Sequence, residues 1–439
     1  MKYARESQAL RLPAFGYHGA SAGARATELY CEAVALENLA ARHGTPLYVY
    51  SAAMIRARVN AFLHAFHSIP HTLCYSVKAN STLAILRLVA GEGAGFDVVS
   101  GGELQRVLRV SRKATSKPKV VFSGVGKTAA EMELAIRSGI LLFNIESASE
   151  LNLLSATATR LKKRAAVALR VNPDVSAKTH PYISTGLHQH KFGVPIPEAR
   201  TLYAQAAKQP YLKVAGVSVH IGSQITDVGT FQEALERVAD LVRALREQGH
   251  DIRYIDAGGG LGISYEGAQG NFEKQIAAYA RAVLAPLRGL KLHLLLEPGR
   301  SIVGPAGVLL TRVLYRKMNY RKRFLIVDAA MNDLLRPSLY GAYHEIVPVS
   351  RQSRETEITD VVGPICETGD FFARDRRLPL VNEGDLLAIL DVGAYGSVLG
   401  SNYNTRGRAA EVLVDGAKAR VIRRRESLQD QMRMEESLL

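Results

Sequence analysis

A lysine, a run of glycines and several carboxylates are the residues of this 439-residue chain whose types and positions could do chemistry. Lys78 directly follows the apolar run Leu73–Val77. An amine at the end of a buried strand would be partly desolvated, which lowers its pKa and makes it available as a Schiff-base nucleophile. Gly258-Gly259-Gly260 also follows a strand-like run and exposes consecutive backbone N–H groups, as a phosphate cradle requires. With a carboxylate for a pyridinium nitrogen, these are the parts of a pyridoxal phosphate site.

The segment Leu73–Gly304 alternates short apolar runs with helical patterns, and this order predicts the frame that positions those residues. Eight runs are strand candidates: Leu73–Val77, Phe96–Val99, Lys119–Phe122, Leu141–Ile145, Ala166–Val171, Val214–Val219, Ile252–Asp256 and Lys291–Leu296. Strand and helix in regular alternation predict a parallel sheet covered by helices. The segment has 232 residues, and a (β/α)₈ barrel typically has about 250. An open doubly wound sheet is the alternative, but eight units in series favour closure.

The segments between the strand candidates have apolar residues spaced three and four apart, as amphipathic helices do. Such segments are Ser81–Ala90, Gly102–Val110, Ala129–Ser138, Ser149–Leu161 and Phe231–Gln248. In the last of these, Leu235, Val238, Leu241, Val242 and Leu245 form one stripe. We therefore expect each helix to place one apolar face against the sheet.

After Gly304 the pattern changes to short strands separated by Gly, Pro, Asn and Asp. The strand candidates there are Val308–Leu314, Arg323–Val327, Glu345–Val349, Ile358–Val362, Leu386–Val392 and Glu411–Val414. This pattern predicts a β-sandwich or small β-barrel. The expected domains are an N-terminal segment, 1–47, that packs on the β domain, a cofactor-binding barrel, 48–304, and the C-terminal β domain, 305–439.

Chemistry in a (β/α)₈ barrel gathers at the carboxyl ends of the strands. Reading the chain at those ends gives Lys78, Asp97, Ser123, Asn144, Glu146, Arg170, Asn172, His220, Glu297 and Arg300, besides the glycine run. Ionisable side chains at so many strand ends exceed what solubility requires. The set as a whole therefore indicates an active site.

Seven ordered motifs between Tyr48 and Val414 resemble the diaminopimelate decarboxylase family. They are Tyr75-Ser76-Val77-Lys78-Ala79-Asn80, Phe96-Asp97-Val98-Val99-Ser100-Gly101-Gly102-Glu103, His220-Ile221-Gly222-Ser223-Gln224, Asp256-Ala257-Gly258-Gly259-Gly260, Glu297-Pro298-Gly299-Arg300, Cys366-Glu367 and Gly393-Ala394-Tyr395-Gly396. The resemblance implies a fold-type III pyridoxal phosphate enzyme built from a barrel and a β domain. It also implies release of CO₂ from meso-2,6-diaminopimelate to give L-lysine, the last step of lysine biosynthesis.

The same resemblance implies a role for each matched residue toward the cofactor. Lys78 would bond to it covalently, His220 would stack on its ring, and Glu297 would pair with the pyridine nitrogen. The phosphate would be bound by Ser223, Gly258, Gly259, Gly260, Gly299 and Arg300, with Tyr395 at its edge. Asp97 and Arg170 would surround Lys78 and the cofactor, and the segment from Asn172 to Gly193 would form a loop over the site.

Substrate recognition needs groups for a distal amino-acid head that carries both an ammonium and a carboxylate. Arg300 and Arg336 could hold the carboxylate, with a hydrogen bond from Tyr340 and a further contact from Tyr395. Glu367 could take the ammonium. Ornithine ends in a lone ammonium, and burying an arginine beside it would cost several kcal/mol. Arg300 and Arg336 therefore favour diaminopimelate over ornithine as substrate. The list of catalytic residues implied is Lys78, His220 and Cys366, with Cys366 as proton donor and Lys78 as the alternative.

Composition and charge limit the other classes of protein. With 47% hydrophobic and 22% charged residues, the chain is not expected to be disordered, collagenous or coiled-coil. The chain has neither an apolar run of roughly 18 residues, which a membrane span needs, nor a signal-peptide pattern. Its three cysteines are odd in number and far apart. We therefore expect a cytoplasmic protein without a disulfide framework. No metal site is expected.

The net charge of +15 raises the question of a polyanionic partner. The basic clusters at 106–119, 160–164, 312–323 and 420–425 lack a stacking platform of interleaved aromatics. We therefore expect these clusters to be solvated faces, with neither nucleic acid nor membrane as partner. The resemblance implies a small-molecule substrate and a homodimer with shared active sites, as in the family. The alternatives are a fold-type III decarboxylase for ornithine, arginine or a D-amino acid, and a catalytically silent cofactor-binding relative.

Overall fold

The computed structural model describes residues 7–9, 14–19, 27–112, 118–175, 191–266, 271–351, 355–436 and 438–439. The chain divides into two compact units. One unit, the barrel unit, comprises Arg58–Ile263 and Gly270–Ser301. The other, the β unit, comprises Met1–Ala57, Ser264–Gln269 and Ile302–Leu439.

The barrel unit contains eight parallel strands that close on themselves. They are β6 (His71–Ser76), β7 (Gly95–Val98), β8 (Val120–Phe122), β9 (Leu142–Ile145), β10 (Ala165–Asn172), β12 (Leu212–Val219), β13 (Tyr254–Asp256) and β14 (His293–Leu296). Pairing of β14 with β6 and of β9 with β10 closes the barrel, and the short strand β11 (Val194–Pro195) adds to β10. The predicted (β/α)₈ barrel is confirmed, and each expected strand overlaps an observed one with ends that differ by at most two residues.

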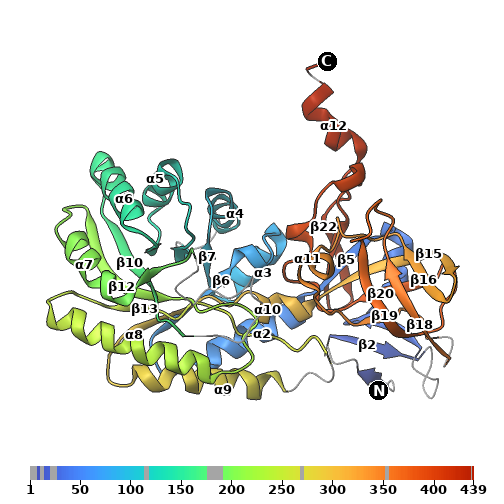
Figure 1. The fold of residues 1–439 in the computed structure, drawn as a ribbon, viewed down its shortest axis with the longest axis horizontal. Coiled ribbons are helices and arrows are strands. Elements are labelled where there is room, and N and C mark those ends of the chain that lie inside the picture. The colour runs from blue at the N-terminus through green and yellow to red at the C-terminus, as the bar shows by residue number, and fades with distance from the viewer. Residues whose placement is uncertain are drawn as a thin grey trace. The chain divides into compact units, whose positions relative to one another are not determined.

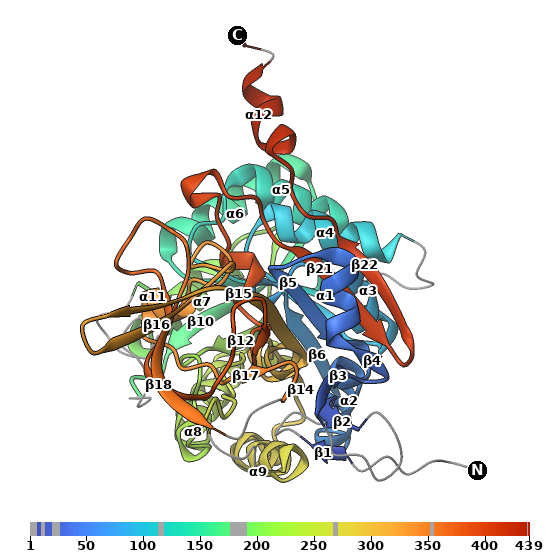
Figure 2. The same cartoon turned by 90° about the vertical axis from the view of Figure 1, so that its right-hand side faces the viewer.

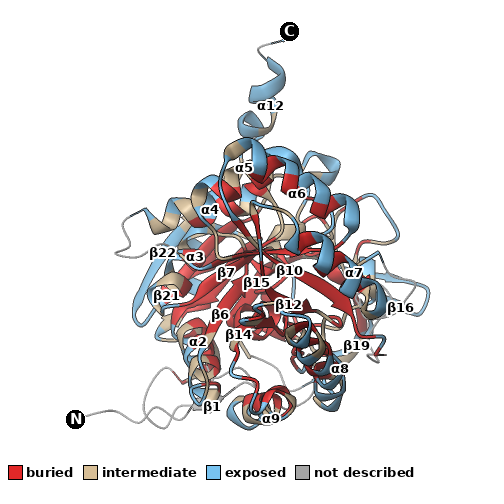
Figure 3. Cartoon of the chain, turned by 90° about the vertical axis from the view of Figure 1, so that its left-hand side faces the viewer, coloured by how far each residue is buried: buried red, intermediate tan, exposed pale blue. Residues whose placement is uncertain are grey.

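The strands of the barrel are apolar on both faces, as parallel strands covered by helices are. The central cluster consists of fully buried side chains from six strands: Cys74, Val121, Leu142, Ala168, Ala215 and Leu295. Figure 3 shows these buried strands at the centre, with helices around them whose outer surfaces are exposed. The polar strand ends described below therefore start from a rigid, filled core.

Helices cover the outside of the barrel (Figure 1). They are α3 (Leu83–Gly91), α4 (Gly101–Ser111), α5 (Ala129–Ser138), α6 (Ala148–Leu161), α7 (Ile196–Ala207), α8 (Gly229–Glu247) and α9 (Phe272–Leu284). Four begin at a side chain that caps the first turn, Ser100, Thr128, Ser147 and Asn271, which satisfies otherwise unpaired N–H groups. The apolar stripe expected along α8 is buried as predicted.

The β unit is built on a nine-stranded sheet. Its strands are β5 (Leu47–Ser51), β15 (Gly307–Asn319), β16 (Lys322–Val327), β17 (Ile346–Pro348), β18 (Thr356–Val362), β19 (Phe371–Pro379), β20 (Leu386–Ile389), β21 (Ala410–Asp415) and β22 (Lys418–Arg423). Figure 2 faces this sheet, in which β5 pairs with both β15 and β21. The predicted boundary at residue 47 therefore cuts through a strand of the β unit, and the structure moves it to residue 57.

Sequence analysis did not predict two strands of this sheet, β19 and β22. Both lie at an end of the strand order. The side chains of β22 are mostly exposed, and the centre of β19 is the charged run Arg374-Asp375-Arg376-Arg377. An edge strand that faces water has no apolar run to mark it.

The remaining elements of the β unit lie before β5 and near the carboxyl terminus. A four-stranded antiparallel sheet is formed by β1 (Ser7–Ala9), β2 (Phe15–His18), β3 (Glu28–Cys31) and β4 (Val34–Ala35), followed by α1 (Leu36–His43). Leu29 N–H donates to the Val349 carbonyl at 2.8 Å, which ties β3 to the chain beside β17. Helix α2 (Ala52–Ala65) leads to the barrel, α10 (Arg300–Val303) leads from it, and α11 (Arg336–Tyr340) and α12 (Leu428–Glu436) complete the chain. In the described part of the chain no helix is long and apolar enough to cross a membrane.

Candidate active site

Lys78 lies in a short turn, Val77–Ala79, directly after β6, and its amine is held by a carboxylate of the next strand. Lys78 Nζ lies 2.8 Å from Asp97 Oδ2, and Ser76 Oγ donates to the same oxygen at 2.8 Å. Asp97 is fully buried, whereas the Lys78 side chain is 36% exposed. The structure thus brings two predicted site residues together. The Lys78 side chain is only partly exposed, in agreement with the expected partial desolvation, and its ion pair with Asp97 is a feature that the sequence did not indicate.

Glu297 follows β14 and forms part of a buried network with residues of three other strands. Its Oε1 accepts hydrogen bonds from Ser123 Oγ at 3.1 Å and Asn144 Nδ2 at 3.5 Å. Asn144 Nδ2 also donates to Asp256 Oδ2 at 2.6 Å. Burial raises the pKa of Glu297 well above its usual range, and the neighbouring carboxyls of Asp256 and Asp97 raise it further. The raised pKa favours the protonated form of Glu297, which can donate a hydrogen bond.

His220 follows β12 and is neutral. Burial lowers the pKa of its imidazole well below the usual range, and the cations Arg170 and Lys78 lower it further. Gly259 N–H donates to Nδ1 at 3.2 Å, so the ring proton is on Nε2. A neutral imidazole fixed through its backbone-facing nitrogen presents a flat ring, which suits the predicted stacking role.

Arg170, at the end of β10, is held by its own carboxylate partner. Its Nη1 lies 3.0 and 3.2 Å from the two carboxylate oxygens of Glu146, and its Nη2 donates to the His220 carbonyl at 3.3 Å. Its guanidinium also lies over the ring of Phe192, 4.8 Å from the centroid. Arg170 therefore contacts the backbone of His220, and its charge lowers the pKa of the imidazole. The predicted covering loop falls largely on residues 176–190, which lie outside the described residues.

The glycine run after β13 differs from the predicted phosphate cradle. Gly258 N–H donates to Asp256 Oδ1 at 2.9 Å and Gly259 N–H to His220 Nδ1, so two of the three N–H groups are used within the protein. Gly260 N–H has no partner among the described residues. A Cβ on Gly259 would lie 2.1 Å from the Glu297 carbonyl oxygen. Close approach to β14 therefore explains the glycine at 259, and only Gly260 offers an N–H to an anion.

Ser223 and Arg300, both predicted phosphate ligands, lie in contact. Arg300 Nη2 donates to Ser223 Oγ at 3.1 Å, and the arginine is buried. The adjacent Gly299 packs against the turn that carries Lys78, because a Cβ there would lie 2.9 Å from Ala79 Cβ. A hydroxyl and a guanidinium side by side are suited to a phosphate or a carboxylate.

In the β unit, Arg336 and Tyr340 lie on the same helix, α11. The Arg336 guanidinium is buried between the rings of Tyr265 and Tyr340, 5.2 and 5.9 Å from their centroids. Arg336 Nε donates to His344 Nε2 at 3.3 Å. The expected association of Arg336 with Tyr340 is thus present in the structure, with an imidazole that orients the guanidinium.

Cys366 and Glu367 are exposed in a loop of the β unit that a buried aspartate anchors. Asp370 accepts backbone hydrogen bonds from Ile365 at 2.8 Å and Met331 at 2.7 Å. The Cys366 N–H donates to Asn404 Oδ1 at 2.9 Å, and the Glu367 carboxylate bonds to the Tyr403 hydroxyl. The loop therefore presents a thiol and a carboxylate to solvent on a fixed backbone.

Tyr395, the remaining predicted residue of this unit, is half-buried between β20 and the turn Ser397–Leu399. Its φ is +56°, in the left-handed region that non-glycine residues rarely adopt. Such a conformation fixes the direction of the side chain at a cost in energy, as at many functional sites.

The residues of the barrel unit fit pyridoxal phosphate. Lys78 supplies an amine, Glu297 a protonated carboxyl for a ring nitrogen, and Arg300 with Ser223 a site for the phosphate. Asp97 Oδ1 and Asn144 Oδ1 are buried acceptors with no hydrogen-bond partner among the described residues. Both lie at these strand ends and could accept hydrogen bonds from a bound ligand. No cluster of three or more metal-ligating side chains occurs in the described ranges.

Sequence reasoning missed Asp256 as a member of this buried network. It stood only as the first residue of the glycine motif, although it ends a barrel strand and is fully buried. A carboxylate at the last position of an apolar strand is the signal that could have found it.

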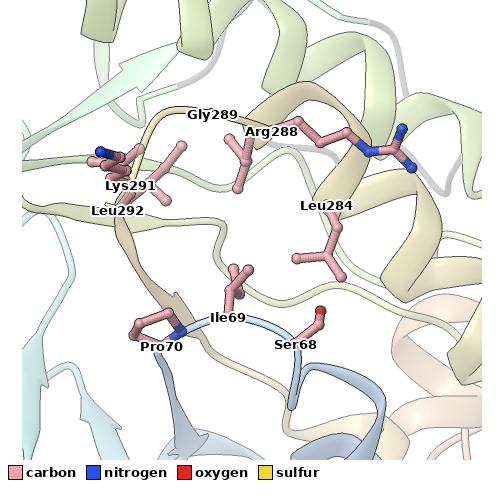
Figure 4. A pocket seen from close by; sticks show the side chains of 10 residues that line it. Ser68, Ile69, Pro70, Leu284, Arg288, Gly289, Lys291 and Leu292 are labelled. Carbon is pink, nitrogen blue, oxygen red and sulfur yellow. The ribbon is translucent and has the colours of Figure 1, made fainter.

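A cavity of about 420 Å³ opens at the opposite, amino-terminal end of the barrel. Apolar side chains, among them Ile69, Leu284 and Leu292, line it (Figure 4). None of the predicted site residues borders this cavity, so the chemistry remains at the carboxyl ends of the strands.

Comparison with known proteins identifies close relatives. Residues 52–304 match the family described as "Pyridoxal-dependent decarboxylase, pyridoxal binding domain". The chain is 52% identical over 406 residues to the diaminopimelate decarboxylase of Pseudomonas aeruginosa, which covers 92% of this chain and 96% of that protein. Among solved structures, that of diaminopimelate decarboxylase from Helicobacter pylori complexed with L-lysine is 44% identical, with a TM-score of 0.87 over 92% of this chain and all of that one. The M. jannaschii enzyme in complex with L-lysine has a TM-score of 0.90 at 37% identity, over 98% of this chain and all of that one.

Proposed function

The chain belongs to the diaminopimelate decarboxylase family, and on that premise we propose that it converts meso-2,6-diaminopimelate to L-lysine and CO₂ with pyridoxal 5′-phosphate as cofactor. The observation that carries this proposal is 52% identity to a diaminopimelate decarboxylase over nearly the whole of both chains. The reaction is the last step of lysine biosynthesis, and we place it in the cytoplasm.

Bound pyridoxal phosphate would supply an electron-withdrawing ring that accepts the electron pair left behind by CO₂. The barrel unit supplies the groups that hold it. Lys78 would bond to it covalently, the neutral ring of His220 would stack on it, and Glu297 would present a proton to its ring nitrogen. Asp97 orients the Lys78 amine, and Arg170 orients His220 through the backbone carbonyl.

The phosphate would be bound by Arg300, Ser223 and the N–H of Gly260, with Tyr395 at its edge. The Arg300 guanidinium already contacts Ser223 Oγ, so the two groups are positioned before an anion arrives. Pre-positioned donors bind an anion without the cost of ordering side chains. Gly299 contributes by letting its backbone lie against the turn of Lys78.

The distal end of the substrate carries an ammonium and a carboxylate, and we assign the recognition of each to different residues. Arg336 and Arg300 hold the carboxylate, with hydrogen bonds from Tyr340 and Tyr395, and Glu367 holds the ammonium. Support comes from the geometry of Arg336, whose Nε is oriented by His344. Without these charged groups, the site could not distinguish diaminopimelate from amino acids that lack a second amino-acid head.

Return of a proton to the α-carbon is assigned to Cys366, with Lys78 as the alternative donor. The Cys366 thiol is exposed in this chain, which agrees with its use by the second chain of a homodimer. We propose such a dimer, in which Cys366 and Glu367 of one chain serve the site of its partner.

The direct test incubates the purified protein with meso-diaminopimelate, with and without added pyridoxal phosphate. The proposal requires L-lysine and CO₂ in equal amounts, dependent on the cofactor. Cofactor binding without any lysine formation would instead identify a silent relative.

A further inference from the structure

We propose that Asp256 is a positioning residue for the cofactor, acting through Glu297: the two buried carboxyls share one proton, and the Asn144 amide holds both of them in place. The inference rests on the proposed function, because it concerns the ring nitrogen of the proposed cofactor. It adds two residues, Asp256 and Asn144, to the groups that determine the charge at that nitrogen.

The geometry brings the two carboxyls to a single donor. Asn144 Nδ2 lies 2.6 Å from Asp256 Oδ2 and 3.5 Å from Glu297 Oε1. Asp256 is fully buried, Glu297 is 6% exposed and Asn144 1%. Two carboxylates this close in a buried site cannot both ionise, because their repulsion is unscreened. The pair therefore holds one proton between two side chains.

The hydrogen bonds decide which member carries that proton. Asp256 accepts from Gly258 N–H at 2.9 Å, from Asn144 at 2.6 Å and from Ser218 Oγ at 3.4 Å. Among the described residues Glu297 accepts the Ser123 hydroxyl at 3.1 Å and the longer bond from Asn144. The Asp256 and Glu297 carboxyls also hydrogen-bond to each other, which lowers the pKa of Asp256 and raises that of Glu297. Donors stabilise the ionised form. Asp256 is thus the carboxylate and Glu297 the acid.

Other titratable groups around the pair do not change this assignment. Asp97 and Lys78 face Glu297 but are paired with each other. Cys74 and Tyr279 also face the pair, and their pKa values are raised by burial and by its negative charge, so both stay neutral. His220, whose ring accepts from the adjacent Gly259, is neutral as well.

The consequence is that Glu297 already holds the proton that a protonated ring nitrogen requires. The proton moves from the Glu297 carboxyl toward the ring nitrogen, Asp256 stays ionised throughout, and no proton enters from solvent. Without the charge of Asp256, Glu297 would ionise at lower pH, and the same proton would have to be taken up from water when the ring binds.

The test measures proton uptake by calorimetry in buffers of different ionisation enthalpy. The probe is 4′-deoxypyridoxine 5′-phosphate, which has the ring nitrogen and the phosphate but no aldehyde for Lys78. At pH 8, Asp256→Asn should take up at least half a proton more per probe bound than the wild type. The control Asp240→Asn, an exposed residue on α8 paired with Arg243, should match the wild type. In a Glu297→Gln background, Asp256→Asn should change nothing.

Equal proton uptake in wild type and Asp256→Asn, or an effect of Asp256→Asn that persists beside Glu297→Gln, would overturn the inference. If Asp256→Asn does not fold, infrared spectroscopy of the cofactor-free wild type decides the matter. Glu297→Gln should remove the stretch of a protonated carboxyl at pH 7.5, and its absence from the wild type contradicts the shared proton. Failure of the wild type to bind the probe would instead refute the proposed cofactor.

Discussion

Lys78 Nζ lies 2.8 Å from Oδ2 of Asp97, a side chain with no exposed surface. The pair places a cation at the mouth of the barrel and its anion inside, beside Ser76. Asp97 thereby keeps the amine at the carboxyl end of β6 instead of leaving a four-carbon chain free in solvent. The proposed attachment point of the cofactor is thus held by a residue of the neighbouring strand, β7.

Lys78→Ala should abolish covalent attachment of pyridoxal phosphate and lower turnover by at least about 1,000-fold, because no other amine takes its place. Borohydride reduction followed by mass spectrometry of the peptide that contains residue 78 measures attachment. The control Lys213→Ala changes an exposed lysine of β12 and should behave as wild type. Turnover near the wild-type value in Lys78→Ala would refute the assignment.

Asp97→Asn keeps the size of the side chain but removes the charge that holds the Lys78 amine. Charge-assisted hydrogen bonds contribute about 1.5–3 kcal/mol, and partial exposure of Lys78 favours the lower end, so kcat should fall roughly tenfold. Stopped-flow absorbance would measure the rate of cofactor attachment, which should fall as well. An unchanged attachment rate would show that Asp97 does not position the amine.

Arg336→Ala should reduce kcat/KM for meso-diaminopimelate by about 10- to 100-fold, chiefly through KM, because a charged hydrogen bond to the distal carboxylate is lost. Arg336→Lys retains the charge but lacks the planar guanidinium, so its kcat/KM should lie between those of the wild type and Arg336→Ala. The matched control is Arg374→Ala. In the wild type the Arg374 guanidinium stacks on the ring of Phe371 in β19, 3.9 Å from its centroid. Melting curves separate this effect from a loss of stability, and unchanged turnover would contradict the assignment.

Asp333 should make the protein less stable as pH rises. Burial raises the pKa of Asp333 to about 7 in the folded chain, above its value in the unfolded chain, so the unfolded chain loses that proton first. The free energy of unfolding should therefore fall between pH 4 and pH 7, by up to about 4 kcal/mol from this group.

Asp333→Asn can still accept the Ala330 N–H bond and removes that titration. Urea unfolding of both proteins at pH 5 and pH 8 measures the effect, and the advantage of Asp333→Asn should be larger at pH 8. The same advantage at both pH values would show that Asp333 does not titrate in this range. Asp240→Asn again serves as the control.

The barrel could be predicted because its strands are buried on both faces and read as apolar runs, with a polar residue such as Lys78 or His220 just beyond the end. The same rule failed at β22, whose side chains are mostly exposed. It also missed β19, whose centre is charged. Strand-to-strand pairing could not be read from the pattern, which is why β5 was divided between two domains.

Within the site, residue types at strand ends could be predicted from the sequence, but their hydrogen-bond partners could not. Three consecutive glycines suggested three free N–H groups, yet Asp256 and His220 use two of them. Partial desolvation of Lys78 follows from its place at a strand end, but its ion pair with a carboxylate one strand away does not. Contacts between residues far apart in the sequence determine both the hydrogen bonds of the glycines and the ion pair of Lys78. The local sequence pattern does not predict such contacts.

The central claim is the identity of the substrate, and CO₂ release by the purified protein with added pyridoxal phosphate tests it most directly. The substrates are meso-diaminopimelate, L-lysine, L-ornithine and L-arginine, each over a range of concentrations. The account predicts CO₂ from meso-diaminopimelate, with an equal amount of L-lysine, and a kcat/KM for the other three at least about 1,000-fold lower. Comparable release from ornithine, arginine or lysine would contradict it.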